Sequence, residues 1–137
     1  MDRLVQVGDV LINSTGAGTL GRVAQVRAPI SDCTVDTHVT IVRPLDPDYV
    51  GFLGVALLEM EPVFSTMGVG STNQTELGRA DIGALSLTLP PQNLRKEFHD
   101  RTWPIFMQVE TLSQANSCLA QAREELLPKL MSGAIQV

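Results

Sequence analysis

Residues 8–23 read Gly8-Asp9-Val10-Leu11-Ile12-Asn13-Ser14-Thr15-Gly16-Ala17-Gly18-Thr19-Leu20-Gly21-Arg22-Val23, and they are the most informative part of the chain. Two short apolar runs, Val10–Ile12 and Val23–Val26, flank a loop with three glycines and three hydroxyl side chains. Glycine adopts backbone angles that other residues avoid, so this pattern predicts two strands joined by a tight loop. The loop offers backbone N–H groups and small hydroxyls to a partner that comes close.

Two nucleotide-binding motifs match the spacing of this loop, but neither fits its surroundings. The three glycines satisfy G-x-G-x-x-G, which requires a following helix whose N-terminus holds a pyrophosphate. Instead, the residues after the loop alternate as a strand does until Pro29. As a phosphate loop, the segment has Arg22 where lysine is required and Val23 where a hydroxyl should bind magnesium. A loop that merely turns the chain is the simpler alternative.

The stretches from Gly8 to Gly16 and from Gly18 to Ala24 resemble the central hairpin of target recognition domains in the specificity subunits of type I restriction-modification systems. Three further stretches follow in that family's order and approximate spacing: Gly70-Ser71-Thr72-Asn73-Gln74-Thr75-Glu76-Leu77, Leu87-Thr88-Leu89-Pro90-Pro91 and Leu126-Leu127-Pro128-Lys129-Leu130-Met131-Ser132-Gly133. The chain departs from the family after the proline pair, where Gln92-Asn93 stands for a usual Glu-Gln, and at Ala134, which is usually acidic. The resemblance covers the second half of a recognition domain and the helix after it.

This resemblance implies recognition of double-stranded DNA in a complex whose catalytic chains, the type I methyltransferase and restriction subunits, are separate proteins. It implies no catalytic residue, metal or cofactor in this chain. We expect DNA contacts from two polar loops: Asn13, Ser14, Thr15, Gly16, Gly18, Thr19 and Arg22 in the first, and Ser71, Thr72, Asn73 and Gln74 in the second. Asparagine and glutamine amides can contact adenine, and arginine can contact guanine or a phosphate.

The composition predicts one cytoplasmic domain. At 137 residues and 44% hydrophobic content, the chain can bury a single core. The longest apolar stretch, Val50–Leu58, is too short to span a membrane, and no hydrophobic signal region follows Met1. Cys33 and Cys118 are far apart and lack nearby histidines, so they predict neither a metal site nor a disulfide scaffold.

The charge of the chain argues against DNA binding. Its formal net charge is −5. The residues through Leu89 include five arginines, no lysine and ten acidic residues. Neutralisation of phosphates supplies most non-specific DNA affinity, so a DNA-binding surface should be basic. We therefore expect few phosphate contacts from this chain and more from the methyltransferase chains.

The sequence predicts an α+β fold, in which a small mixed sheet with short helices precedes a long C-terminal helix that packs as a coiled coil. Alternating or periodic apolar residues predict a strand at Asp36–Val42, a helix at Tyr49–Met60 capped by Asp48 and stopped by Pro62, a short helix within residues 75–85, and a strand at Leu85–Leu89. We divide the chain into a partial recognition domain, residues 1–91, and a helical dimerisation or spacer segment, residues 92–137.

The last third has helical periodicity. Eight residues alternate spacings of four and three, as a coiled-coil seam requires: Ile105, Val109, Leu112, Asn116, Leu119, Arg123, Leu126 and Leu130. A continuous helix from Pro104 to Pro128 would be more than about 30 Å long, which exceeds what so small a domain can cover. In the family, two such helices pack antiparallel between two recognition domains, so we expect a homodimer. The alternative is an amphipathic helix packed on its own domain.

Other features of this segment predict its boundaries. Pro104 lacks a hydrogen-bond donor, which predicts a kink or break near Trp103. Trp103, with Phe98 and Phe106 nearby, either anchors the helix to the sheet domain or forms part of the partner surface. Gly133 suits a helix C-terminal cap, and residues 134–137 alternate as an edge strand would.

We find no catalytic pattern. His38 lies in a predicted strand and His99 in a charged helix, without metal-ligand spacing between them. His38 is expected to face solvent or a polar neighbour, with a base contact as the alternative. Three functions of different class remain: a DNA-recognition subunit, a dimerising scaffold that binds modification subunits without contacting DNA bases, and a nucleotide-binding enzyme, which would need a helix after Gly21.

Overall fold

The computed structural model describes residues 4–70 and 75–135. The chain forms two compact units, one comprising Met1–Trp103 and the other Pro104–Val137. The first unit contains the sheet and four helical segments, and it also includes the beginning of the long C-terminal helix. The predicted α+β class is confirmed.

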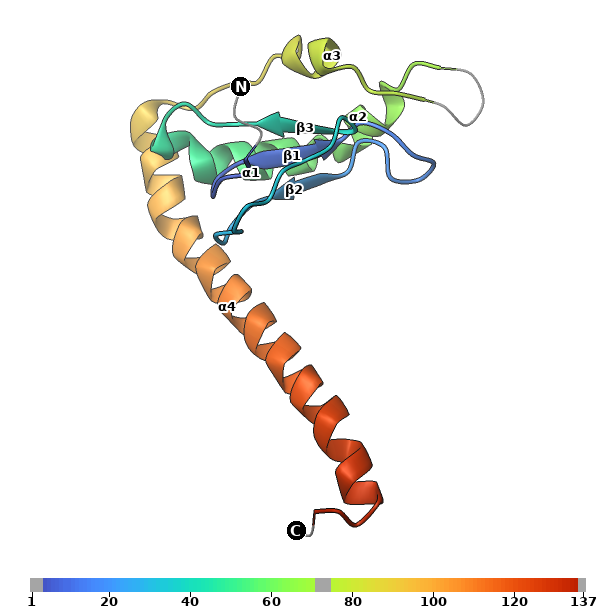
Figure 1. Ribbon diagram of the computed structural model, residues 1–137. Coiled ribbons are helices and arrows are strands. Elements are labelled where there is room, and N and C mark those ends of the chain that lie inside the picture. The colour runs from blue at the N-terminus through green and yellow to red at the C-terminus, as the bar shows by residue number, and fades with distance from the viewer. Residues whose placement is uncertain (1–3, 71–74, 136–137) are drawn as a thin grey trace. The chain divides into compact units, whose positions relative to one another are not determined.

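Three strands form the sheet of the first unit: β1 (Val10–Asn13), β2 (Val23–Gln25) and β3 (Val39–Val42). β1 lies in the centre and pairs antiparallel with both neighbours, as Figure 1 shows. Ile12 stands opposite Val23 on one side and Thr40 on the other. The two strands predicted around the glycine loop are confirmed. The pairing among these strands is antiparallel rather than mixed.

β3 begins later than the sequence predicts. The Asp36 side chain accepts a hydrogen bond from the His38 N–H at 2.8 Å. This local bond turns the chain, as aspartate side chains often do. The extended pairing therefore starts at Val39 instead of Asp36.

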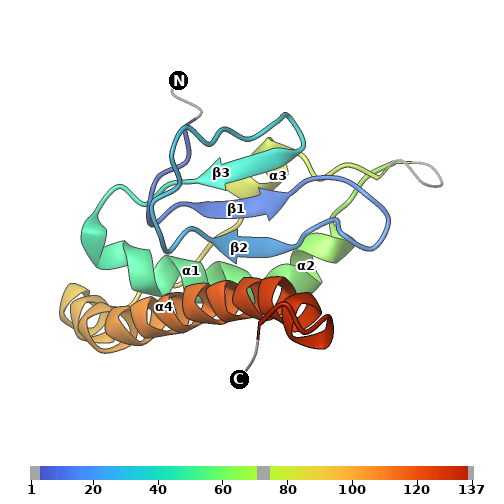
Figure 2. The same cartoon turned by 60° about the horizontal axis from the view of Figure 1, so that its bottom comes forward.

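The core lies on one face of the sheet. Val10 and Ile12 are fully buried on this face, and the helices α1 (Val50–Glu59) and α2 (Glu61–Thr66) pack along the same side of the sheet (Figures 1 and 2). α2 contributes Phe64, which is also fully buried. The buried cluster consists of Val10, Ile12, Val23, Leu57, Phe64, Leu77 and Ile82.

The helix predicted at Tyr49–Met60 is present, but its ends differ from the prediction. A single turn of 3-10 helix, η1 (Pro47–Tyr49), precedes α1, and the Asp46 carboxylate caps it by accepting from the Asp48 N–H at 2.9 Å. Asp48 therefore does not cap α1, whose N-cap residue Tyr49 forms no side-chain capping bond, and Asp46 caps the preceding turn instead. Pro62 does not end the helical region but lies in the first turn of α2, where a missing N–H is tolerated.

The short helix predicted within residues 75–85 is confirmed, but the strand predicted after it is absent. α3 spans Arg79–Gly83, and residues 85–89 belong to no strand and pair with none of the described strands. Leu85 and Leu87 nevertheless pack against the core. The alternation that predicted a strand thus reflects packing of every second side chain and not a hydrogen-bonded ladder.

The long helix α4 spans Gln92–Met131. Its first turns belong to the first unit, where the Arg95 guanidinium lies 4.3 Å above the Tyr49 ring. A Cβ on Gly51 would lie 3.2 Å from the His99 Cα, so the glycine allows α1 and this part of α4 to approach closely. Trp103 stacks on His99 with ring centroids 5.5 Å apart.

The helix continues through Pro104, so the predicted break is not observed. The boundary between the two units nevertheless falls between Trp103 and Pro104. At the other end, Gly133 has φ +72 and its N–H donates to the Leu130 carbonyl at 3.1 Å. The predicted glycine cap is thereby confirmed. Ala134 and Ile135 are not in a strand, and residues 136 and 137 lie outside the described residues.

Candidate functional site

The glycine loop between β1 and β2 is held in shape by its own polar side chains. The Asn13 Nδ2 donates to the carbonyls of Thr15 at 2.8 Å and Thr19 at 2.9 Å. The Thr19 Oγ1 also donates to the Thr15 carbonyl, at 3.1 Å. The donors of Asn13 and Thr19 that sequence reasoning assigned to DNA contacts therefore bind the loop backbone.

Two glycines of the loop have different structural roles. Gly21 has φ +81, and a Cβ there would lie 2.6 Å from the Ser65 backbone nitrogen. This glycine lets the loop pack directly against the backbone of α2. Gly18 has φ +77, but a Cβ there would meet no atom within 4 Å. Its backbone conformation needs glycine, whereas its surroundings are open.

Ser14 lies inside the sheet domain. It is 2% exposed, and its Oγ lies 3.2 Å from the buried Thr40 Oγ1. Its N–H donates to the His38 carbonyl at 2.7 Å. The structure therefore places this hydroxyl away from the surface that a DNA backbone could reach.

The exposed part of the loop consists of Gly16, Ala17, Gly18 and Thr19, followed by the exposed Arg22. The N–H groups of Ala17 and Gly18 have no hydrogen-bond acceptor within residues 4–70 and 75–135. These two N–H groups and the Arg22 guanidinium are donors that the loop presents to solvent.

The second predicted loop, Ser71–Gln74, lies outside the described residues, but the chain on either side of it is placed. Val69 and Glu76 exchange two backbone hydrogen bonds of 3.1 Å. Glu76 also forms a bridge with Thr15, and the Leu77 N–H donates to the Ser14 carbonyl at 2.9 Å. The structure thus places the base of the second loop beside the first.

An open recess of about 450 Å³ lies between the glycine loop and the junction of α1 and α2. One wall is formed by the loop, and the other is formed by the end of α1 and the first turns of α2. The lining residues are Gly18, Leu20, Gly21, Arg22, Leu58, Glu59, Glu61, Pro62 and Ser65. The Glu61 Oε1 accepts from the Val23 N–H at 2.7 Å and so ties α2 to the start of β2.

Sequence reasoning did not identify Glu59 or Glu61 as site residues. They flank Met60 between an apolar helix and a proline, and nothing in their spacing relates them to residue 22. Only the close packing at Gly21 brings them to the same recess as Arg22.

His38 is exposed, as one of its two predicted placements requires. Its Nδ1 lies 3.4 Å from the Asp36 Oδ2. The pKa of Asp36 is lowered, chiefly because its carboxylate accepts a hydrogen bond from the His38 backbone N–H. The pair lies on the surface of the sheet domain and does not line the recess.

The second unit exposes the predicted seam. Its six apolar members, Ile105, Val109, Leu112, Leu119, Leu126 and Leu130, are 42–68% exposed. Asn116 and Arg123 are also exposed, and the Arg123 Nη2 lies 2.6 Å from the Glu124 Oε1. The described part of the chain thus leaves a long apolar helix face uncovered.

The described residues provide no metal site, disulfide or membrane-spanning helix. No group of three or more His, Cys, Asp or Glu side chains in residues 4–70 and 75–135 could hold a metal ion. Cys33 and Cys118 are both free thiols. None of the helices in this part of the chain is long and apolar enough to cross a membrane. Comparison with known proteins finds no family model that matches the chain, and no curated protein matches it either.

Proposed function

We propose that this chain is a non-catalytic, cytoplasmic specificity subunit of a type I restriction-modification complex. In this role it recognises double-stranded DNA and directs methyltransferase and restriction chains to a target site. The observation on which the proposal rests is the glycine loop, which is held by its own hydrogen bonds and presents donors to solvent beside the base of the second predicted loop. The sequence resemblance supplies the class of complex.

The donors of the loop suit contacts with a DNA backbone. Backbone N–H groups and arginine side chains bind phosphate oxygens and fix the position of a protein on the duplex. Successive N–H groups in a loop with left-handed residues also form an anion-binding concavity. Ala17 and Gly18 provide such N–H donors, and Ser14 is removed from the contact set because it is buried.

The second unit supports a dimer. A stripe of leucine, isoleucine and valine exposed along a helix is unfavourable in water, and burial stabilises by about 25 cal/mol per Å² of apolar surface. We propose that a second copy of this chain covers the seam. The eight seam positions are symmetric about the midpoint between Ser117 and Cys118, so two antiparallel copies can place Ile105 opposite Leu130, Val109 opposite Leu126, Leu112 opposite Arg123 and Asn116 opposite Leu119.

The polar members of the seam favour this antiparallel arrangement. In a parallel pair the two Arg123 side chains would meet in one core layer, where like charges repel. In the antiparallel pair each Arg123 lies against Leu112 of the second copy. The two Asn116 side chains lie in neighbouring layers, about 4.5 Å apart along the axis, where their amides can pair. A polar residue at such a position fixes register and partner number.

A second function is favoured by the charge of the chain. The net charge of −5 opposes approach to DNA, and the donors of Asn13 and Thr19 bind the loop itself. A dimeric scaffold that binds methyltransferase chains without contacting DNA bases would have the same exposed helix. The two functions differ in whether the sequence of this chain determines the methylated sites.

Co-expression with a type I methyltransferase subunit tests the proposal. The chain should co-purify with that subunit, and sequencing of methylated DNA should show one recurring target. Replacement of the exposed residues 16–19 and of residues 71–74 by Gly-Ser linkers of equal length should abolish methylation at that target while the complex still assembles. An unchanged methylated target would favour the scaffold, and failure to bind any methyltransferase subunit would contradict both functions.

A further inference from the structure

The recess beside the glycine loop has a carboxylate whose role the proposed function does not explain. Glu59 is exposed at the end of α1 and lines the recess together with Arg22. Neither side chain forms a hydrogen bond or ion pair with another residue of the described ranges, although the two share one recess. Glu61 differs, because its Oε1 accepts from the Val23 N–H at 2.7 Å.

A carboxylate next to a DNA-binding loop excludes a phosphate from its neighbourhood, because like charges repel. It is instead suited to the amino group of a base. In the major groove, glutamate accepts a hydrogen bond from cytosine N4, and arginine donates two hydrogen bonds to guanine O6 and N7. An arginine and a glutamate that face one recess therefore match the two edges of a G·C pair.

The structure holds the two side chains on firmly connected elements. Gly21, next to Arg22, packs so closely on α2 that a Cβ would lie 2.6 Å from the Ser65 nitrogen. The bond between Glu61 and the Val23 N–H ties α2 to the other side of Arg22. Glu59 is two residues before Glu61 in the chain. Sites built on such elements maintain the geometry that discrimination between bases requires.

We infer that Arg22 and Glu59 together recognise a G·C pair in the target DNA, with Arg22 on the guanine and Glu59 on the cytosine amino group. This inference rests on the proposed function and identifies a specificity-determining residue outside the two polar loops. Glu61 is a positioning residue in this arrangement. The acidic recess then contributes to base recognition, although it adds nothing to non-specific affinity for phosphate.

The test compares the methylated sequence of three complexes: wild type, Glu59→Gln and Glu97→Gln. Glu97 is an exposed glutamate whose contact is an ion pair with Arg101 on the same helix, so its variant controls for the loss of one charge. Glutamine loses the negative charge that favours the cytosine amino group, whereas Arg22 still contacts the guanine of the same pair. Glu59→Gln should therefore reduce discrimination in favour of this G·C pair by roughly tenfold to a hundredfold. Arg22→Gln should reduce discrimination at the same pair.

Several outcomes would overturn the inference. One is a target unchanged by Glu59→Gln in a complex that still methylates specific DNA, which leaves the proposed function standing. Another is a uniform loss of affinity for all DNA sequences, which would indicate that Glu59 acts on folding or on the overall electrostatic potential of the protein. Thermal unfolding of the variant distinguishes these two causes. A wild-type complex without any DNA preference would overturn the inference together with the function.

Discussion

Asp9 and Arg43 form a two-point ion pair that joins the start of β1 to the end of β3. The Arg43 Nε lies 2.7 Å from the Asp9 Oδ1, and the Nη2 lies 2.7 Å from the Oδ2. Asp9 is 1% exposed and also accepts from the Gln6 N–H at 2.8 Å. Paired, parallel hydrogen bonds of this kind are among the stronger polar contacts in proteins.

Replacement of this aspartate should destabilise the fold. Asp9→Ala removes the counter-charge of the Arg43 guanidinium and leaves a buried space beside it. It also removes the hydrogen-bond acceptor of the Gln6 N–H. Breaking a buried pair typically costs 3–5 kcal/mol, and Arg43 is 34% exposed, so we expect a loss of about 3 kcal/mol in the free energy of unfolding. Urea denaturation followed by circular dichroism measures it.

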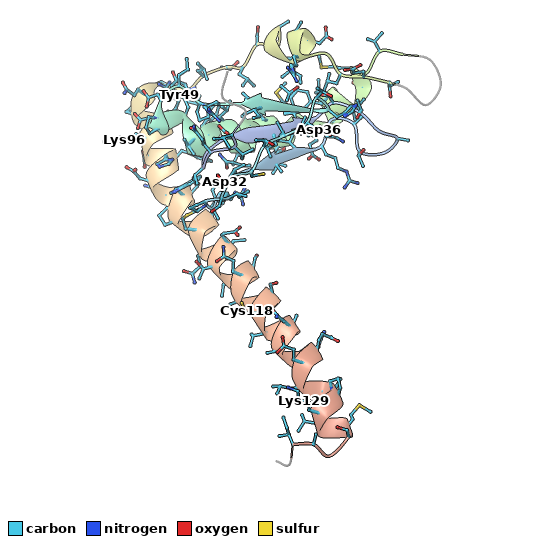
Figure 3. All side chains as sticks on the ribbon, in the orientation of Figure 1. Asp32, Asp36, Tyr49, Lys96, Cys118 and Lys129 are labelled. Carbon is cyan, nitrogen blue, oxygen red and sulfur yellow. The ribbon has the colours of Figure 1, made fainter. Side chains whose placement is uncertain are left out.

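The exposed pair of Asp36 and His38 provides the matched control. Asp36→Ala removes a carboxylate on the surface of the same domain, where solvent screens the charge (Figure 3). Its urea midpoint should fall far less than that of Asp9→Ala, because Asp36 loses only a solvent-exposed local bond to the His38 N–H. Equal midpoints for Asp9→Ala and wild type would show that the buried pair adds no net stability.

The two glycines at φ near +80 should respond differently to alanine. Both Gly18→Ala and Gly21→Ala impose a left-handed conformation on a residue with a Cβ, at about 1–2 kcal/mol each. Gly21→Ala additionally drives a Cβ into the backbone of Ser65. We expect Gly21→Ala to cost about 3 kcal/mol or more and Gly18→Ala about 1 kcal/mol. Thermal melting of the two variants measures this difference. Similar losses of stability in both variants would contradict the prediction.

A bulky residue at Gly18 would not test DNA contact alone. The φ of Gly18 is +77, so the substitution would strain the loop as well as block DNA. Ala17 is exposed and has no positive φ, so Ala17→Glu is the better variant for placing bulk and charge at the loop tip.

The sequence alone predicted those strands and helices whose signals lie within the segment itself. Apolar runs around a glycine loop predicted β1 and β2, and an apolar stretch predicted α1, because these signals lie within a few residues of the structure they produce. Leu85–Leu89 shows where this reasoning fails. Alternation reports which side chains are buried, whereas a strand also requires a neighbour with which to pair.

The candidate site was less predictable because it depends on side-chain hydrogen bonds and distant packing. Ser14 is a polar residue in a glycine-rich stretch, so the sequence suggests that it lies on the surface. Its burial is accompanied by a contact with Thr40, which is 26 residues away in the chain. Glu59 enters the recess only because Gly21 packs against α2. Neither relation leaves a periodic signal in the sequence.

The seam on α4 gives a prediction about assembly. The chain should sediment as a dimer at micromolar concentration, because six exposed apolar side chains then become buried. Leu119→Asp places a charge in the middle of the seam and should convert the dimer to a monomer. Ser117→Asp, on the outer face of the same turn, should leave the dimer intact. A wild-type monomer at high micromolar concentration would rule out the proposed interface.

The orientation of the two helices has a separate test. Met131 is 81% exposed near the end of α4 and can be replaced by cysteine for spin labelling, with Cys33 and Cys118 changed to serine. In the antiparallel arrangement the two labels lie about 40 Å apart along the axis, at 1.5 Å per residue. In a parallel pair the labels lie side by side, so electron–electron distance measurements showing a short separation would exclude the antiparallel register.

Arg22 should contribute to DNA recognition through a base contact. In the complex with methyltransferase chains, Arg22→Ala should lower discrimination at one base pair by roughly tenfold and leave the slope of log affinity against log salt concentration unchanged. A slope reduced by about one would instead indicate that one phosphate contact is lost, which would contradict the assignment of Arg22 to guanine. Arg79→Ala removes another exposed arginine, on α3, and should leave both quantities at their wild-type values. Titrations from low to physiological salt, with target and scrambled duplexes, distinguish these results. If Arg22→Ala and Arg79→Ala behave alike, the exposed donor next to the glycine loop does not touch DNA.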